Sequence, residues 1–185
     1  MEQQQSVRDN PLAFESTGRL IAKYSVPSVI AMLVSSLYNI VDQIFIGQGV
    51  GMLGNAATNV AFPFVNICIA LSLLIGIGGA SNFNLNMGRG ENEKAKSYAG
   101  TSISLLILSG LALSIFSLLF LKPILIAFGS TKQVFPYALT YTRITALGFP
   151  FLIATNGFCN LIRSDGSPRY SMVVMVTGAV INTCL

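Results

Sequence analysis

The chain has no histidine, few charged residues and only three cysteines, and each shortage excludes a class of function. Without an imidazole, HExxH zinc sites and histidine-based catalytic triads are excluded. Charged residues make up 10% of the 185 residues, whereas soluble domains carry about 25%, so an ordinary soluble domain is excluded as well. Cys68, Cys159 and Cys184 lie in apolar runs without CxxC spacing. We therefore expect them to pack against neighbours and to form neither a disulfide nor a metal site.

What the chain has in abundance is apolar residues, at 52% of the sequence, with a mean hydropathy of +0.67. After a polar tail over residues 1–18, which lacks the apolar core of a signal peptide, this pattern predicts an all-α membrane protein, a polytopic bundle over 19–185. The fifth segment stops short of the roughly twenty residues that a span needs, so we expect a fragment of a larger bundle. The predicted helices cover about 20–46, 56–83, 98–121, 135–162 and 170–185.

Basic residues predict the orientation of the chain, because cytoplasmic loops of membrane proteins carry an excess of Lys and Arg. Eight basic residues fall in the tail, the second connection and the fourth connection, and two fall in the third. This predicts a multi-pass protein of the inner (cytoplasmic) membrane with its N-terminus in the cytoplasm. The net charge of +4 thus indicates contact with the lipid bilayer and not with nucleic acid. The eight are Arg8, Arg19, Lys23, Arg89, Lys94, Lys96, Arg163 and Arg169, and the two are Lys122 and Lys132.

Asp42 is a carboxylate inside the first apolar run, where a charge costs about 2.5–3.5 kcal/mol on insertion scales. Ser28, Ser35 and Asp42 recur every seven residues, and Tyr38 precedes Asp42 by four, so they share one helical face. Asn39 and Gln43 lie beside that face, and Pro27 permits a bend. For the neutral side chains the alternative to a binding role is hydrogen bonding between helices, and each such bond is worth about 0.6 kcal/mol. An ionised group needs a partner, a proton or a cation.

Other spans place amides at the predicted depth of Asp42. Asn59 and Asn66 are seven residues apart in the second span, and Asn182 lies in the fifth. If the first, second and fifth helices are neighbours, these groups form a polar pocket around the carboxylate. Such a pocket can hold a proton or Na⁺ and exchange it for an organic cation, which is the minimum chemistry of an antiporter. We expect no cofactor beyond the coupling ion, H⁺ or Na⁺, and no metal other than Na⁺ at Asp42.

Three stretches carry a family resemblance: Asn-Ile-Val-Asp-Gln-Ile-Phe-Ile-Gly at 39–47, Gly-Arg-Gly-Glu-Asn-Glu-Lys-Ala at 88–95, and Asn-Leu-Ile-Arg-Ser-Asp-Gly-Ser-Pro-Arg at 160–169. In this order they resemble MATE (multidrug and toxic compound extrusion) transporters, most closely the bacterial MepA/DinF-like branch. The resemblance implies a twelve-helix protein of two six-helix lobes, with this chain in the N-terminal lobe and a C-terminal lobe missing.

The resemblance also implies roles for individual residues. Asp42 would couple transport to the cation, with Tyr38 and Asn182 beside it, and Pro27 would be the point at which the helix bends. Asn156 and Asn160 match further polar positions of the family, and with Ser35, Asn39, Asn59 and Asn66 they make up the expected polar pocket. The family's second acidic residue, four positions after Asn182, would fall just past Leu185.

The leading interpretation is therefore a secondary antiporter that exports organic cations or drugs by alternating access, although this chain alone would not be competent. The alternative is a flippase for lipids or lipid-linked oligosaccharides. It is disfavoured because Arg143 is the only basic residue deep in a span. We expect no enzyme, since Asp165, the partner that an aspartyl protease would need, lies in a turn. For Gly76, Gly78 and Gly79 we expect close helix packing and no phosphate loop.

Overall fold

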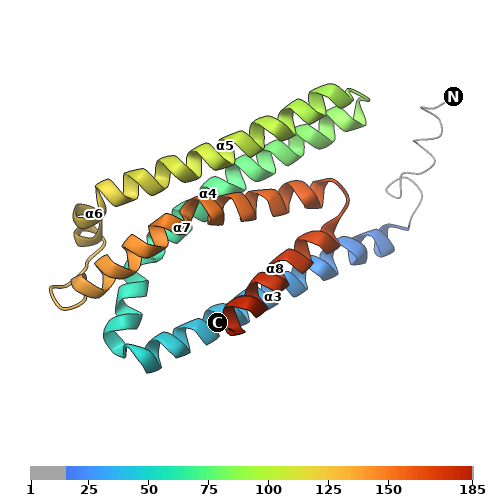
Figure 1. Ribbon diagram of the computed structural model, residues 1–185. Coiled ribbons are helices and arrows are strands. Elements are labelled where there is room, and N and C mark those ends of the chain that lie inside the picture. The colour runs from blue at the N-terminus through green and yellow to red at the C-terminus, as the bar shows by residue number, and fades with distance from the viewer. Residues whose placement is uncertain (1–15, 185) are drawn as a thin grey trace. The chain divides into compact units, whose positions relative to one another are not determined.

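The computed structural model describes residues 16–184, which form two units. One unit holds the described residues up to Asn39 together with those from Pro168 onward, and the other holds Ile40–Ser167. The first helix, α3 (Thr17–Gly49), contributes to both units (Figure 1). Of the predicted polar tail, residues 1–15 lie outside the described part of the chain.

The described chain is all-α, as the sequence predicts. After α3 come α4 (Met52–Gly88), α5 (Asn92–Leu119), the short α6 (Leu121–Ala127), α7 (Phe135–Ser164) and α8 (Pro168–Cys184). Within the described residues, α3, α4, α5 and α7 are long and apolar enough to cross a membrane. Each contains an 18-residue stretch of high mean hydropathy, with values of 1.7, 2.4, 2.2 and 1.3 in that order. Helices suit a bilayer because they pair every interior backbone N–H and C=O within one segment.

The helix ends differ from the predicted ones. Residues 84–88 continue α4, and α5 begins at Asn92 instead of 98, because polar residues extend a helix beyond its apolar stretch. Two ion pairs of 3.0 Å, Lys94 with Glu91 and Lys96 with Glu93, join neighbouring turns at the start of α5.

The predicted connection 122–134 was wrong in part, because it contains most of α6. That helix buries Leu121 and Leu125, and Pro123 sits in its first turn, where no hydrogen bond is lost.

The core of the larger unit lies where α4, α5 and α7 pack together. Gly110 of α5 lies against Pro150 of α7, and Leu106, one turn earlier, meets Gly157, so α5 runs antiparallel to α7. Gly76 of α4 lies against the same Gly157, and α4 and α7 run in parallel (Figure 1). Buried aromatic and aliphatic side chains fill the space between them, namely Phe64, Leu106, Phe149 and Ile153.

Small residues bring these helices to backbone contact. A Cβ added at Gly76 would lie 3.0 Å from the Cα of Gly157, and one added at Gly79 would collide with Ser102. The predicted close packing is thus confirmed for Gly76 and Gly79, whereas a Cβ at Gly78 would meet open space. Without side chains at the contact, two helices gain dispersion energy along their backbones, which is how helices associate in lipid.

Pro150 interrupts the hydrogen bonding of α7, and a hydroxyl on α5 repairs it. Proline has no N–H, so it cannot donate to the carbonyl oxygen four residues earlier, that of Ala146. The buried Ser114 hydroxyl of α5 donates to that oxygen at 2.8 Å. The bond therefore satisfies an orphaned carbonyl deep in the unit and fixes the height of α5 against α7.

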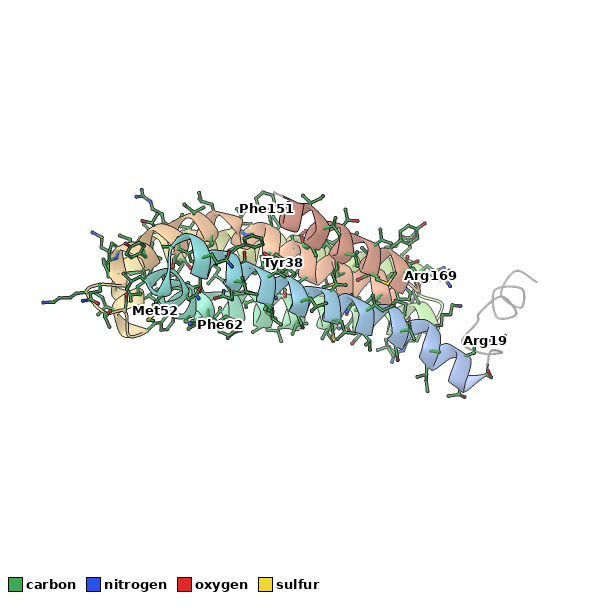
Figure 2. All side chains as sticks on the ribbon, turned by 90° about the horizontal axis from the view of Figure 1, so that it is seen from below. Arg19, Tyr38, Met52, Phe62, Phe151 and Arg169 are labelled. Carbon is green, nitrogen blue, oxygen red and sulfur yellow. The ribbon has the colours of Figure 1, made fainter. Side chains whose placement is uncertain are left out.

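The smaller unit contains the first part of α3 and all of α8, which run in the same direction, with Arg19 and Arg169 toward the same end (Figure 2). Pro168 occupies the first position of α8, where its missing N–H costs nothing. Pro27, Ala31 and Ser171 are buried, but most apolar side chains of α3 are exposed, including Val26, Ile30, Leu33 and Leu37. This apolar surface is left for lipid or for further protein to cover.

Candidate functional site

Asp42 lies in α3 within the larger unit, seven residues before the helix ends at Gly49. Its side chain is half-buried. No hydrogen bond or ion pair joins its carboxylate to any other described residue. The group therefore sits in a helix long enough to span a membrane without a basic partner in the described part of the chain. A carboxylate in that position is stabilised by a bound proton or cation.

Polar groups gather where the end of α3 meets the start of α4. One of them belongs to Gln43, which directly follows Asp42 in the sequence. The Thr58 hydroxyl donates to the Asn55 carbonyl oxygen at 2.9 Å and approaches Gln43 Oε1 at 3.3 Å. Asn55 Nδ2 packs against Gly47, since a Cβ there would be only 3.0 Å away. Asn55 Oδ1 is buried and has no hydrogen-bond partner among the described groups.

The backbone of α4 adds a further oxygen near this corner. Pro63 lies inside α4 and has no N–H to donate to the carbonyl oxygen of Asn59. Asn59 directly follows Thr58, and its side chain is exposed. The corner thus combines side-chain amide, hydroxyl and backbone carbonyl oxygens, which are donor types that hard cations prefer, and Asp42 directly precedes one of its residues, Gln43, in the sequence.

The sequence interpretation did not include Asn55 and Thr58 in the site. The connection between α3 and α4 is only two residues long, Val50 and Gly51, and Gly51 takes a φ of 78° that suits glycine. So short a connection brings the last turns of α3 beside the first turns of α4. The sequence predicts a connection over 47–55 instead, so it gives no sign that Asn55 and Thr58 lie beside the end of α3.

The remaining predicted residues of α3 lie in the smaller unit. Tyr38 is half-buried one helical turn before Asp42 along α3 (Figure 2). The Asn39 side-chain amide donates to the Ser35 carbonyl oxygen at 2.8 Å, so it is bonded within its own helix. Pro27 is buried inside α3. Asn182 lies in the last turn of α8, and its predicted position beside Asp42 stays a prediction.

The four other asparagines of the expected polar pocket fall into two groups. Asn59 and Asn66 are exposed on one side of α4. Asn156 and Asn160 are half-buried on α7 and donate to the carbonyl oxygens of Leu152 and Asn156, at 2.9 and 3.0 Å. Since Gly76 is level with Gly157, Asn156 stands about 14 Å further along the bundle than Asn66, at about 1.5 Å per residue. The two groups therefore occupy different heights and do not line one pocket.

These features define a polytopic α-helical membrane protein with a half-buried carboxylate in one of its spanning helices. The sequence pattern of the MatE family matches residues 27–185, and the chain belongs to that family. The resemblance in the three motifs is thereby confirmed.

The similar proteins are longer than this chain. The probable multidrug resistance protein YoeA of Bacillus subtilis (strain 168) is 24% identical over 170 residues, which are 92% of this chain and 37% of YoeA. A MATE protein crystallised in complex with MaD5 is 28% identical, with a TM-score of 0.82 over 89% of this chain and 37% of that one. A multidrug resistance MATE family transporter of the MOP superfamily, in an outward-facing conformation, is 27% identical with a TM-score of 0.80, over 89% of this chain and 36% of its own. This chain thus spans a little over a third of each relative's length.

Proposed function

We propose that this chain forms part of the N-terminal lobe of a secondary antiporter that exports organic cations in exchange for H⁺ or Na⁺. Membership of the MatE family supports export of drug-like molecules, as does the name of the similar B. subtilis protein. Transport would proceed by alternating access, with a second lobe enclosing the substrate cavity. The single observation that carries the coupling role is Asp42, an acid in a spanning helix without a described basic partner.

The surroundings of Asp42 favour the exchange of one cation for another. A salt bridge to Lys or Arg would hold the carboxylate ionised and compete with any incoming cation. The polar groups at the corner of α3 and α4, which includes the next residue after Asp42, are instead neutral: Gln43, Thr58 and Asn55. The oxygen atoms of these groups can coordinate Na⁺, and they can also accept a hydrogen bond from a protonated carboxyl group. Both coupling ions are therefore chemically accessible. The family resemblance adds Tyr38 and Asn182 as further candidate residues for cation coupling.

We also propose that the protein lies in the inner membrane with its N-terminus in the cytoplasm. The antiparallel packing of the larger unit supports this, because more basic residues lie at the predicted cytoplasmic end than toward the opposite end. The first set is Arg89, Lys94, Lys96 and Arg163, and the second is Lys122, Lys132 and Arg143. In the smaller unit Arg19 and Arg169 share an end (Figure 2).

Cysteines introduced at the exposed Lys96 and Thr131, in a cysteine-free background, test the orientation. An impermeant thiol reagent added to whole cells should label the one at 131 and spare the one at 96.

The coupling role is tested with Asp42→Asn in the full-length protein, reconstituted in vesicles. The variant keeps the shape of the side chain and loses its negative charge. We expect insertion and yield to be unchanged and efflux driven by an imposed gradient to be abolished, because the carboxylate that would bind the coupling ion is removed. Proton and sodium gradients imposed in turn identify the ion.

Asp165→Asn is the matched control, since Asp165 is exposed at the end of α7, outside the apolar stretch. We expect it to transport as the unmodified protein does. Efflux by the Asp42→Asn variant at the unmodified rate under both gradients would contradict the proposal. Equal losses in both variants would mean that charge in general, and not the coupling site, was disturbed.

A further inference from the structure

A cavity of 640 Å³ opens on the larger unit, where the last turn of α5 and the start of α6 meet the first half of α7. Its volume lies within the range of about 300–1,000 Å³ that is usual for small-molecule sites. Most of its wall is aliphatic, and two side chains in it are charged, both positively. The residues that matter here are Leu118, Leu119, Leu139, Leu147, Lys122 and Arg143.

Lys122 and Arg143 have no acidic neighbour in this cavity. Neither side chain makes a hydrogen bond or an ion pair with the described residues, and no acid is among the residues that line the wall. Lys94 and Lys96, at the other end of the unit, each pair with a glutamate at 3.0 Å. Two uncompensated cations beside one apolar wall attract an anion and repel an organic cation, so this cavity does not suit the exported substrate.

The depth of the cavity places it at the boundary between the hydrocarbon and the lipid headgroups. The 30 residues of α7 extend about 45 Å, whereas the hydrocarbon core of a bilayer is about 30 Å thick. With α7 centred in the bilayer, the Cα of Arg143 lies about 10 Å from the midplane, or about 5 Å inside the hydrocarbon edge. A side chain as long as arginine reaches from there to the headgroups, and Lys122, just beyond the end of α5, starts closer to them.

We propose that this cavity binds one anionic phospholipid. Arg143 would hold the phosphate through its two parallel N–H donors, and Lys122 would add a second positive charge. An acyl chain would lie along Leu118, Leu139 and Leu147, with its apolar surface matched to theirs. A free phosphate ion would satisfy the two cations but leave the leucine wall uncovered, so a lipid accounts for both halves of the cavity. The site does not depend on the transport reaction.

Native mass spectrometry of the full-length protein tests this, with phosphatidylglycerol and phosphatidylcholine of the same acyl chains added in turn. We expect the unmodified protein to retain phosphatidylglycerol about tenfold more tightly. The double variant K122Q/R143Q should lose that preference. K122Q alone should lose about threefold, and because Lys122 is exposed this variant folds even if the double variant does not.

The matched control is K132Q. Lys132 is exposed in the connection between α6 and α7, carries the same charge as Lys122 and does not line the cavity. It should retain phosphatidylglycerol as the unmodified protein does. Equal losses in K122Q and K132Q would overturn the proposal in favour of general surface charge. Equal retention of the two lipids by the unmodified protein would also overturn it, as would displacement of phosphatidylglycerol by an equal concentration of inorganic phosphate, which would reveal a site for free anions.

Discussion

Gly110 of α5 faces the backbone of α7, so an added methyl group there has no flexible neighbour to displace. A Cβ at this position would lie 2.7 Å from the Cα of Pro150. Ordinary carbon–carbon contacts are about 3.5–4.0 Å, so Gly110→Ala must push the two helices apart by about 1 Å. Overpacking of this kind costs about 1–3 kcal/mol.

The same displacement reaches the Ser114 hydrogen bond one turn further along α5. That bond is 2.8 Å long, and lengthening it by about 1 Å removes most of its contribution, about 1 kcal/mol. Against these losses, alanine is a better helix former than glycine by about 0.8–1.0 kcal/mol. Gly100→Ala, in the same helix with no atom within 4 Å of the added Cβ, makes that gain without the collision. The difference between the two variants is therefore about 2–4 kcal/mol, and helix propensity cancels from it.

Thermal unfolding in detergent measures this difference through the cysteines. Cys68 and Cys159 are buried, at 0% and 4% exposed, so a thiol-reactive dye labels them only when the unit opens. Mass spectrometry identifies which cysteines carry the dye. Because Cys68 lies in α4 and Cys159 in α7, dye on these two residues reports the opening of the larger unit. We expect Gly110→Ala to open at a lower temperature than the unmodified protein and Gly100→Ala at the same or a higher one. Equal midpoints for the two variants would refute the inference that α5 and α7 are in backbone contact.

Other substitutions test single features of the same unit with the same labelling measurement. Ser114→Ala should destabilise by about 1–3 kcal/mol by leaving the Ala146 carbonyl without a donor. Pro150→Ala, which restores an N–H to that carbonyl, should recover part of the loss, and additive effects of the two would disprove the repair. Thr142→Val should stabilise by about 1 kcal/mol, since the Thr142 hydroxyl is fully buried and has no hydrogen-bond partner among the described groups. A fall in the midpoint for this variant would show that the hydroxyl is bonded.

The number and type of the helices could be predicted because the bilayer imposes a simple demand on sequence, long apolar runs between polar turns. The ends of the helices could not, because polar residues such as Asn86, whose side-chain amide donates to the Asn82 carbonyl oxygen, continue a helix beyond its apolar stretch. The short α6 was missed for a related reason. Its seven residues are too few for a span, and Pro123 suggests a loop until it is placed in a first turn.

The candidate site was predictable only along single helices. Asp42 stands out because a charge in an apolar run is costly, and Tyr38 follows from helical spacing. Contacts between helices depend on which residue lies level with which, and one sequence does not contain that register. The contact between Gly76 and Gly157 sets it for α4 and α7, and it separates Asn66 from Asn156, which the family resemblance had placed in the same pocket.

The two-residue connection after α3 has a mechanical consequence. From Gly49 to Met52 the chain can extend by only about 11 Å, at no more than about 3.6 Å per residue, and Gly47 and Gln43 already contact Asn55 and Thr58 across the corner. A shift of the last turns of α3 along their axis is therefore passed on to the first turns of α4. Since α4 lies against the backbone of α7 at Gly157 and against the Ser102 side chain of α5, we expect the three helices to follow together.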